Sequence, residues 1–204
     1  MTGKQLKNSI LQWAIQGKLV PQDPNDEPAS VLLERIRAEK ARLVKEGKIK
    51  KDKNESIIFR GEDNSYYEKF ADGKVICIDD EIPFEIPEGW MWCRLGNCVS
   101  PDCSLSYGIV QPMNDVLGGI PVVRPVDMNV EIVTLKGLKH VAKEISDSYQ
   151  RTILKGNEIL FCVRGTVGKI SIASSELKGT NVTRGISPIR LDSDSQKFYC
   201  YYCL

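Results

Sequence analysis

The spacing of apolar residues changes partway along this chain, and that change constrains the fold more than any other feature. In residues 1–53 apolar residues recur three or four positions apart, which is the spacing of amphipathic helices. Residues 90–204 instead hold short runs rich in β-branched residues and bounded by glycines. The sequence therefore predicts an α+β protein, in which an N-terminal helical arm precedes a compact mixed or antiparallel sheet domain.

Two helices are expected in the arm. The first is marked by Leu6, Ile10, Trp13 and Ala14, and Gly17 is a typical C-terminal stop. The proline-rich stretch 21–28 then breaks the pattern.

The second helix is expected to be capped by Asp26 or Glu27, to carry Pro28 in its first turn and to end near Gly47. One helix of this length is marginal alone, so we expect a partner helix from a second copy of the chain or from a second half that this chain lacks. Residues 1–53 are thus predicted to serve assembly or dimerisation. The stripe expected to face that partner consists of Leu32, Leu33, Ile36 and Leu43.

Charge is distributed unevenly along the chain. The net charge is only +1, but residues 54–100 hold ten acidic and four basic residues, while residues 136–190 hold ten basic and four acidic. Residues 54–89 are predicted to be an acidic linker with a small hairpin. The basic stretch could face a polyphosphate such as nucleic acid, although an ordinary solvated surface is the alternative.

Motifs for catalysis, metals or cofactors are not recognised. The seven cysteines and single histidine lack a complete zinc pattern, so we expect reduced, idle thiols, with no metal and no cofactor. Gly165–Gly168 lacks the residues of a phosphate loop and is predicted to be a hairpin turn. Glu176 and Lys178, with Asp102 upstream, resemble a nuclease pattern that arises readily by chance.

Membrane insertion and export are not expected either. Apolar runs stay shorter than the roughly 18 residues of a membrane helix, and the N-terminus does not resemble a signal peptide. A cytoplasmic location is therefore expected.

Long stretches resemble the specificity subunits of type I restriction–modification enzymes. Residues 6–50 resemble the helical segment of that family, and Ile82–Gly96 resembles the start of its target recognition domain. Ser106–Ile109, Gly119–Asp127 and Leu154–Ile170 resemble parts of that domain's core.

The resemblance implies a function in DNA recognition. A complete subunit of the family reads two half-sites, and its helices set their separation and dock methyltransferase subunits. This chain holds one helical region and one recognition domain and stops where the next helix would begin, so we expect it to be an N-terminal half, truncated at its C-terminal helix. The expected partners are double-stranded DNA, methyltransferase (modification) subunits and, through the complex, a translocase–nuclease (restriction) subunit.

Candidate base-reading residues are polar and lie in predicted loops. Arg164 suits guanine and Asn181 suits adenine, although Arg164 could instead pair with a carboxylate and residues 181–184 could form a capped turn. The other candidates in these loops are Ser106, Tyr107, Gln111, Thr166, Lys169, Thr183 and Arg184. The residues expected to contact phosphates are Lys136, Lys139, Lys143, Arg151 and Lys155.

Three function classes follow. The first is a noncatalytic, sequence-specific DNA-recognition subunit. The second is a metal-dependent nuclease or another DNA-modifying enzyme, and the third is a general nucleic-acid or protein-interaction module.

Overall fold

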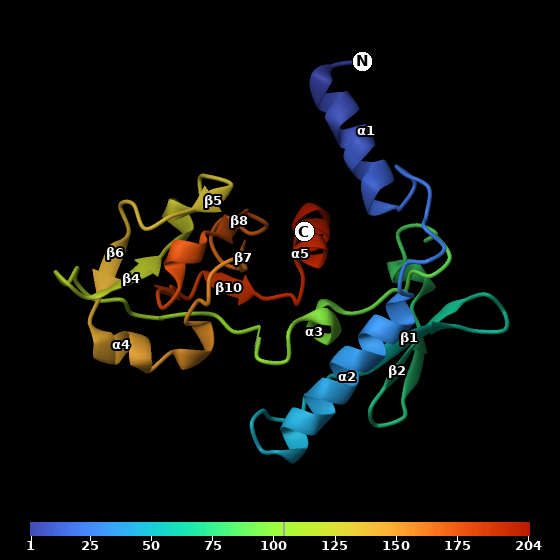
Figure 1. The fold of residues 1–204 in the computed structure, drawn as a ribbon, viewed down its shortest axis with the longest axis horizontal. Helices are drawn as coiled ribbons and strands as arrows, with labels where there is room; N and C mark the ends of the chain where they lie inside the picture. Colours follow the sequence, from blue (N-terminus) through green and yellow to red (C-terminus); the bar gives the residue numbers. More distant parts are fainter. Residues whose placement is uncertain (104) are drawn as a thin grey trace. The chain divides into compact units, whose positions relative to one another are not determined.

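The computed structural model describes residues 1–103 and 105–204, which form two compact units, Met1–Pro101 and Asp102–Leu204 (Figure 1). Helices and small sheets occur together, so the predicted α+β class is confirmed. Within the described residues, every helix is too short or too polar to cross a membrane.

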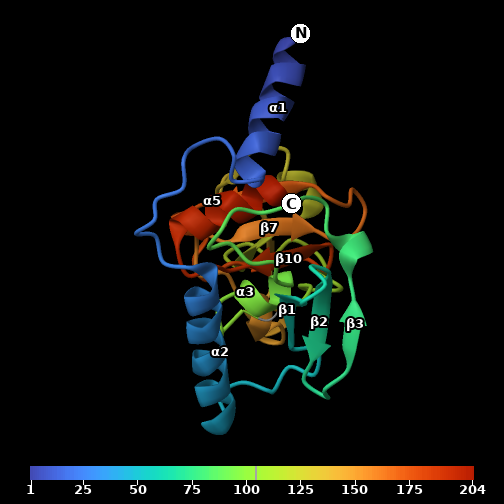
Figure 2. The same cartoon turned by 90° about the vertical axis from the view of Figure 1, so that its right-hand side faces the viewer.

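The first unit holds two long helices and a three-stranded antiparallel sheet of order β1-β2-β3 (Figure 2). Residues 56–77 of the segment 54–89 therefore form a folded sheet and not a linker with a small hairpin, and Ile58 and Ile78 of this segment are buried. The elements of this unit are α1 (Gly3–Ile15), α2 (Ala29–Lys45), β1 (Ser56–Arg60), β2 (Tyr66–Phe70), β3 (Val75–Cys77), the 3₁₀ turn η1 (Asp79–Glu81) and α3 (Leu95–Cys98).

Helix α1 begins and ends through local signals. Thr2 and Gln5 form a reciprocal capping box at its start. Gly17 follows the last turn with φ of +68°, where a Cβ would lie 2.7 Å from Pro87, so glycine is required there. Its predicted apolar residues Leu6 and Trp13 nevertheless stay exposed.

Helix α2 starts differently from the prediction. Pro28 occupies the N-cap and makes no side-chain hydrogen bond there. Neither Asp26 nor Glu27 caps the helix, because Glu27 instead forms two hydrogen bonds with the guanidinium of Arg35, at 2.7 and 3.2 Å. The helix ends at Lys45, two residues before Gly47.

The apolar stripe of α2 packs within its own unit. Ile36 is 3% exposed, whereas the flanking Leu32, Leu33 and Leu43 are half-buried. Lys40 Nζ donates to Gly96 O of α3 at 2.8 Å, so α3 lies against this helix. The expectation that Ile36 needs a helix from another chain is therefore wrong, since Ile36 is already buried within this chain.

We expect Ile36→Ala to destabilise the first unit by about 2–5 kcal/mol, because it leaves a cavity in a packed site. Val31→Ala, at an exposed position of the same helix, should change stability by less than about 0.5 kcal/mol. Urea unfolding of both variants measures the difference. If Ile36→Ala keeps its stability but lowers the mass of the protein in solution, Ile36 serves assembly and not the packing of its own unit.

A buried carboxylate fixes the sheet of the first unit to the segment that follows it. Glu68 accepts hydrogen bonds from Ser56 Oγ at 2.5 Å and from Arg94 at 3.0 and 2.5 Å. Arg94 also binds the exposed Glu81 at 2.6 Å. The Arg94 hydrogen bonds hold the pKa of Glu68 below its ordinary value of 4.5, although burial of the carboxylate opposes them.

Because the pKa of Glu68 is lower in the folded state, its stabilisation is present above pH 4.5 and is lost as pH falls through the folded pKa. We expect Glu68→Gln to cost about 1–3 kcal/mol at neutral pH and to weaken the acid dependence of unfolding. Glu81→Gln, which removes the exposed partner of the same arginine, should cost less than about 1 kcal/mol. Chemical denaturation across the acid range tests both. Parallel pH profiles for the wild type and Glu68→Gln would contradict this account.

The second unit contains two small sheets with both parallel and antiparallel pairs. Their orders are β10-β7-β8-β5 and β6-β4-β9, with β5–β8 and β4–β9 parallel. The elements are β4 (Ile120–Val123), η2 (Pro125–Asp127), β5 (Ile132–Val133), β6 (Lys139–Val141), α4 (Lys143–Asp147), η3 (Gln150–Thr152), β7 (Ile159–Cys162), β8 (Ile170–Ala173), η4 (Ser175–Leu177), β9 (Asn181–Val182), β10 (Ile186–Ile189) and α5 (Asp194–Cys203).

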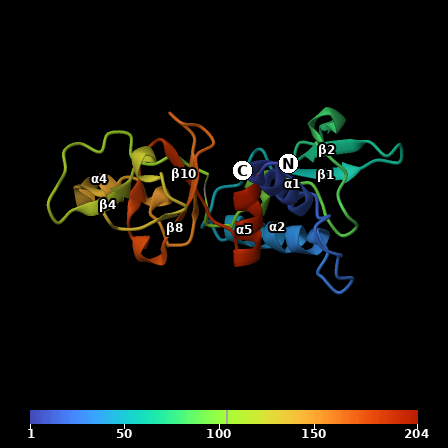
Figure 3. The same cartoon turned by 90° about the horizontal axis from the view of Figure 1, so that it is seen from above.

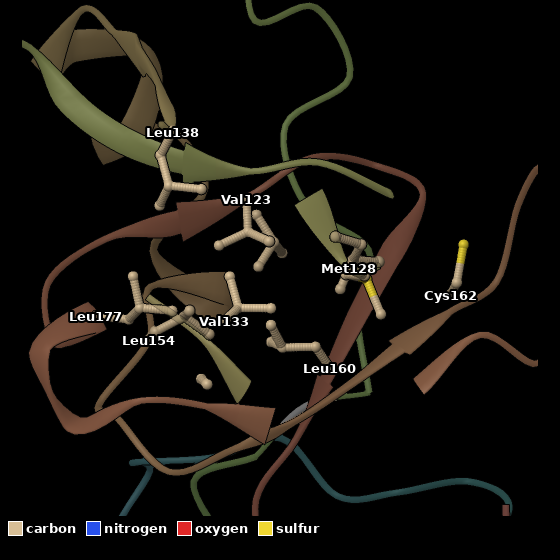
Figure 4. Packing of buried hydrophobic residues seen from close by; sticks show 11 residues of the cluster. Val123, Met128, Val133, Leu138, Leu154, Leu160, Cys162 and Leu177 are labelled. Atoms are coloured by element: carbon tan, nitrogen blue, oxygen red, sulfur yellow. The ribbon is translucent and has the colours of Figure 1, made fainter. Parts of the chain in front are cut away.

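Two apolar clusters hold these sheets together. The larger includes Val123, Val133 and Leu160, which come from three different strands (Figure 4). The smaller joins Ile109, Val122 and Val141, with the side chains of α4 and the turn after it packed on top. Helix α4 accordingly lies beside β4 in two perpendicular views (Figures 1 and 3).

Candidate nucleic-acid interface

The hairpin turn between β7 and β8 is exposed but held firmly. Gly168 N donates to Cys162 O at 3.2 Å, and Lys169 N donates to Thr166 O at 3.3 Å. Gly168 has φ of +81°, a left-handed conformation that glycine adopts without strain. The prediction of a hairpin turn is confirmed, and its residues 163–168 are all exposed.

Arg164 lies at the base of this turn with an exposed guanidinium. Its backbone is fixed, since Val163 N and Arg164 N donate to Gly185 O at 2.8 and 3.4 Å. Its side chain forms no ion pair with any carboxylate in the described part of the chain. The structure therefore does not show the alternative in which Arg164 pairs with a carboxylate.

Arg184 is a second exposed arginine, and it lies next to the base of the hairpin turn. It immediately precedes Gly185, and its backbone N donates to Ile109 O at 2.8 Å. A Cβ on Gly185 would lie 2.7 Å from the Pro125 ring, so glycine allows the turn of Arg164 and the segment of Arg184 to meet here. The backbone segments of two arginines far apart in sequence therefore meet at Gly185.

The segment around Gly108 is hydrogen-bonded to the segment that contains Arg184. Ile109 N donates to Val182 O at 2.8 Å, and a Cβ on Gly108 would lie 1.8 Å from that oxygen. Tyr107 and Gln111, on either side of this contact, are both exposed, whereas Ser106 is half-buried. The arginine loop cluster, as we call this set, consists of Tyr107, Gln111, Arg164, Thr166 and Arg184.

Two other cations nearby have structural partners. Lys169 Nζ donates to Pro125 O at 3.2 Å and also to Asn129 Oδ1, so it braces the hairpin against the loop after β4. Arg124 makes two side-chain hydrogen bonds to Asp127, at 3.0 and 2.8 Å. These contacts distinguish both residues from the exposed Arg164 and Arg184.

The structure corrects the placement of Asn181 and Thr183, which are buried and cannot face a ligand in this fold. The Asn181 amide donates to Ser146 and to Tyr149 O, and its oxygen accepts from Thr152 Oγ1 at 2.7 Å and from Val182 N at 2.9 Å. Every polar group of the side chain is thereby satisfied inside the unit.

The candidate phosphate contacts do not form one face with the cluster. Lys155 precedes β7 and Lys136 follows β5, so both lie at the end of the four-stranded sheet remote from the hairpin turn. Lys155 forms an ion pair with Asp102, which also binds Arg190 at 3.1 Å. Although burial of the carboxyl raises it, these two cations hold the pKa of Asp102 below its ordinary value.

The remaining basic candidates are also dispersed. Lys143 pairs with Asp147 at 3.1 Å on α4, and Lys139 Nζ donates to Met113 O at 2.6 Å. Arg151 is exposed on η3, next to the buried Thr152. The basic excess of residues 136–190 is thus spread by the topology over different sides of the unit.

Apolar neighbours of the cluster were missed by the sequence reasoning. Val126, Val163 and Val167 are exposed at 64%, 39% and 69%, and all three belong to the loops that meet at Gly185. The sequence signal that could have identified them is an apolar valine placed in a turn that is predicted to be exposed. Among the described residues, no group of three or more His, Cys, Asp or Glu side chains is arranged to hold a metal ion.

We expect Asn181→Ala to cost about 1–3 kcal/mol of stability, because it leaves several buried polar groups without their hydrogen-bond partner. Arg184→Ala, three residues later and exposed, should change stability by less than about 0.5 kcal/mol. Thermal unfolding distinguishes the two. Native stability of Asn181→Ala together with an altered base preference would show that Asn181 does reach DNA.

Comparison with known proteins points to one kind of protein, although no protein-family model matches the chain. It is 39% identical over 155 residues to the specificity subunit of the type I restriction enzyme EcoAI of Escherichia coli, covering 76% of this chain and 23% of that subunit. It is 48% identical over 106 residues to the EcoEI specificity subunit, covering 48% of this chain and 15% of that subunit. A third match, to the EcoBI specificity subunit, is 34% identical over 110 residues, or 54% of this chain and 23% of that subunit. The aligned part of the chain thus spans less than a quarter of each of these Escherichia coli relatives.

Proposed function

We propose, from its sequence relationship to type I restriction enzyme specificity subunits, that this chain is a noncatalytic subunit that binds DNA sequence-specifically. The second unit is the reader of one half-site of a two-part recognition sequence. The observation that carries this proposal is the arginine loop cluster, where two exposed guanidiniums stand on hydrogen-bonded loops.

The chemistry of the cluster suits a DNA groove. A guanidinium can donate two hydrogen bonds to guanine in the major groove, and glutamine can pair in the same way with adenine. Thr166 and Tyr107 add hydroxyl groups that can bind phosphate or base edges. Because the backbone of each loop is tied to a strand or to Gly185, little ordering is needed for binding.

The first unit serves assembly in this proposal. Leu6, Ile10 and Trp13 are exposed on α1, whereas the stripe of α2 is largely used within the unit. The exposed face of α1 therefore docks the methyltransferase subunits, through which the translocase–nuclease subunit joins the complex. In such a complex the chain works in the cytoplasm.

We expect Arg164→Ala and Arg184→Ala to weaken binding of a selected duplex, measured with the chain assembled with its methyltransferase subunits. Loss of a base contact should cost about 1–3 kcal/mol and relax one position of the half-site. Loss of a phosphate contact should instead weaken all sequences alike and reduce the salt slope by about 1. Titrations against single-base variants of the duplex separate these cases.

The matched control is Lys155→Ala, which removes the same charge from the same unit but outside the cluster. It should leave base preference unchanged. If both arginine variants bind like the wild type, the cluster is not the DNA face. Metal-dependent cleavage by the chain alone, abolished by Glu176→Ala, would favour the nuclease alternative, and binding without sequence preference would favour a general interaction module.

A further inference from the structure

Val167, in the hairpin turn, is exposed and lies outside the buried core of the second unit. Val167 is 69% exposed and sits in the turn Thr166–Lys169, directly before Gly168. Exposed turns favour Gly, Pro, Asn, Asp and Ser, because these residues adopt turn conformations easily or hydrogen-bond locally. A β-branched apolar side chain gains nothing there from burial in its own unit, which favours a contact with a ligand.

The surroundings of Val167 indicate which ligand that is. Arg164 precedes it by three residues at the base of the hairpin turn, and Arg184 lies next to that base through Gly185. An exposed apolar side chain in a loop group that also carries two exposed arginines suits a surface that is anionic overall but carries small apolar groups. The major groove of DNA has that character, since phosphates line it and each thymine projects a C5-methyl group into it.

The spacing within the turn also suits adjacent bases. Consecutive Cα atoms are about 3.8 Å apart, so the Cα atoms of Arg164 and Val167 are separated by at most about 11 Å. That upper limit equals about three base-pair steps of roughly 3.4 Å, so the two residues lie within the length of a few base pairs. One rigid turn can therefore present a guanidinium and an apolar side chain to base pairs of the same half-site.

We propose that Val167 is a specificity-determining residue that recognises a thymine through its C5-methyl group in the major groove. This inference rests on the proposed function, because it assumes that the second unit reads DNA. It goes further by assigning one side chain to one chemical group of one base. It also commits the turn to the major groove, where that methyl group lies.

Deoxyuridine provides a direct test, because it pairs like thymidine but lacks the C5-methyl group. Each thymine of the half-site is replaced singly in a duplex selected by the assembled complex, and dissociation constants are measured. For the wild type we expect one position at which the replacement weakens binding about fourfold, the effect of removing one methylene-sized apolar contact. For Val167→Ala, binding of thymine and uracil at that position should become equal.

A matched control and a second variant keep the test decisive. Val20→Ala changes a similarly exposed valine, 65% exposed, in the first unit and should retain the full preference for thymine. Val167→Thr nearly preserves the shape of the side chain but replaces a methyl by a hydroxyl, so it should lose part of the preference. Equal unfolding temperatures for all variants show that the fold is intact.

The outcomes separate this inference from the proposed function. Binding without any sequence preference by the wild type would defeat the proposed function, and with it this inference. Sequence-selective binding that is indifferent to uracil, that stays sensitive to it in Val167→Ala, or that selects a half-site lacking thymine would overturn only the role of Val167. Loss of methyltransferase subunits from Val167→Ala with unchanged thymine preference would assign the valine to a protein contact and also overturn it.

Discussion

The buried amide of Asn181 is the contact on which the second unit's exposed loops depend. It joins the end of α4 and the 3₁₀ turn η3 to the first residue of β9. Strand β9 then pairs with β4, and Val182 O receives the backbone N–H of Ile109. Two loops of the arginine loop cluster therefore inherit their positions from one side chain that no ligand can reach.

The structure separates the residues that hold the loops from those that face outward. Lys169 and Arg124 are cations, yet their partners are Asn129 and Asp127, and they fix loop geometry. Arg164 and Arg184 are anchored through their backbones, which leaves their guanidiniums exposed. Such a division suits recognition, because outward side chains can be rigidly placed without using their own hydrogen-bonding groups.

Local signals explain why much of the fold could be predicted from the sequence. The apolar spacing of α1 and α2 and the glycines around β7 and β8 act over a few residues, so both helices and the hairpin were recognisable. The burial of Ile36 and Asn181 depends on elements distant in sequence, and no local pattern distinguishes a buried asparagine from a base-reading one. The basic stretch was misleading for the same reason, since Lys136 and Lys155 are carried by the strand topology away from Arg164.

The close approach at Gly108 and Gly185 has a consequence for how binding properties can vary. Neither backbone position tolerates a Cβ, since one would meet Val182 O and the other the Pro125 ring. The exposed positions beside them, such as Tyr107 and Arg184, meet no such limit, because their side chains extend into solvent. Substitutions there can exchange one hydrogen-bonding pattern for another while the two glycines keep the loops in register, so the outward chemistry of this unit can change without a change of fold.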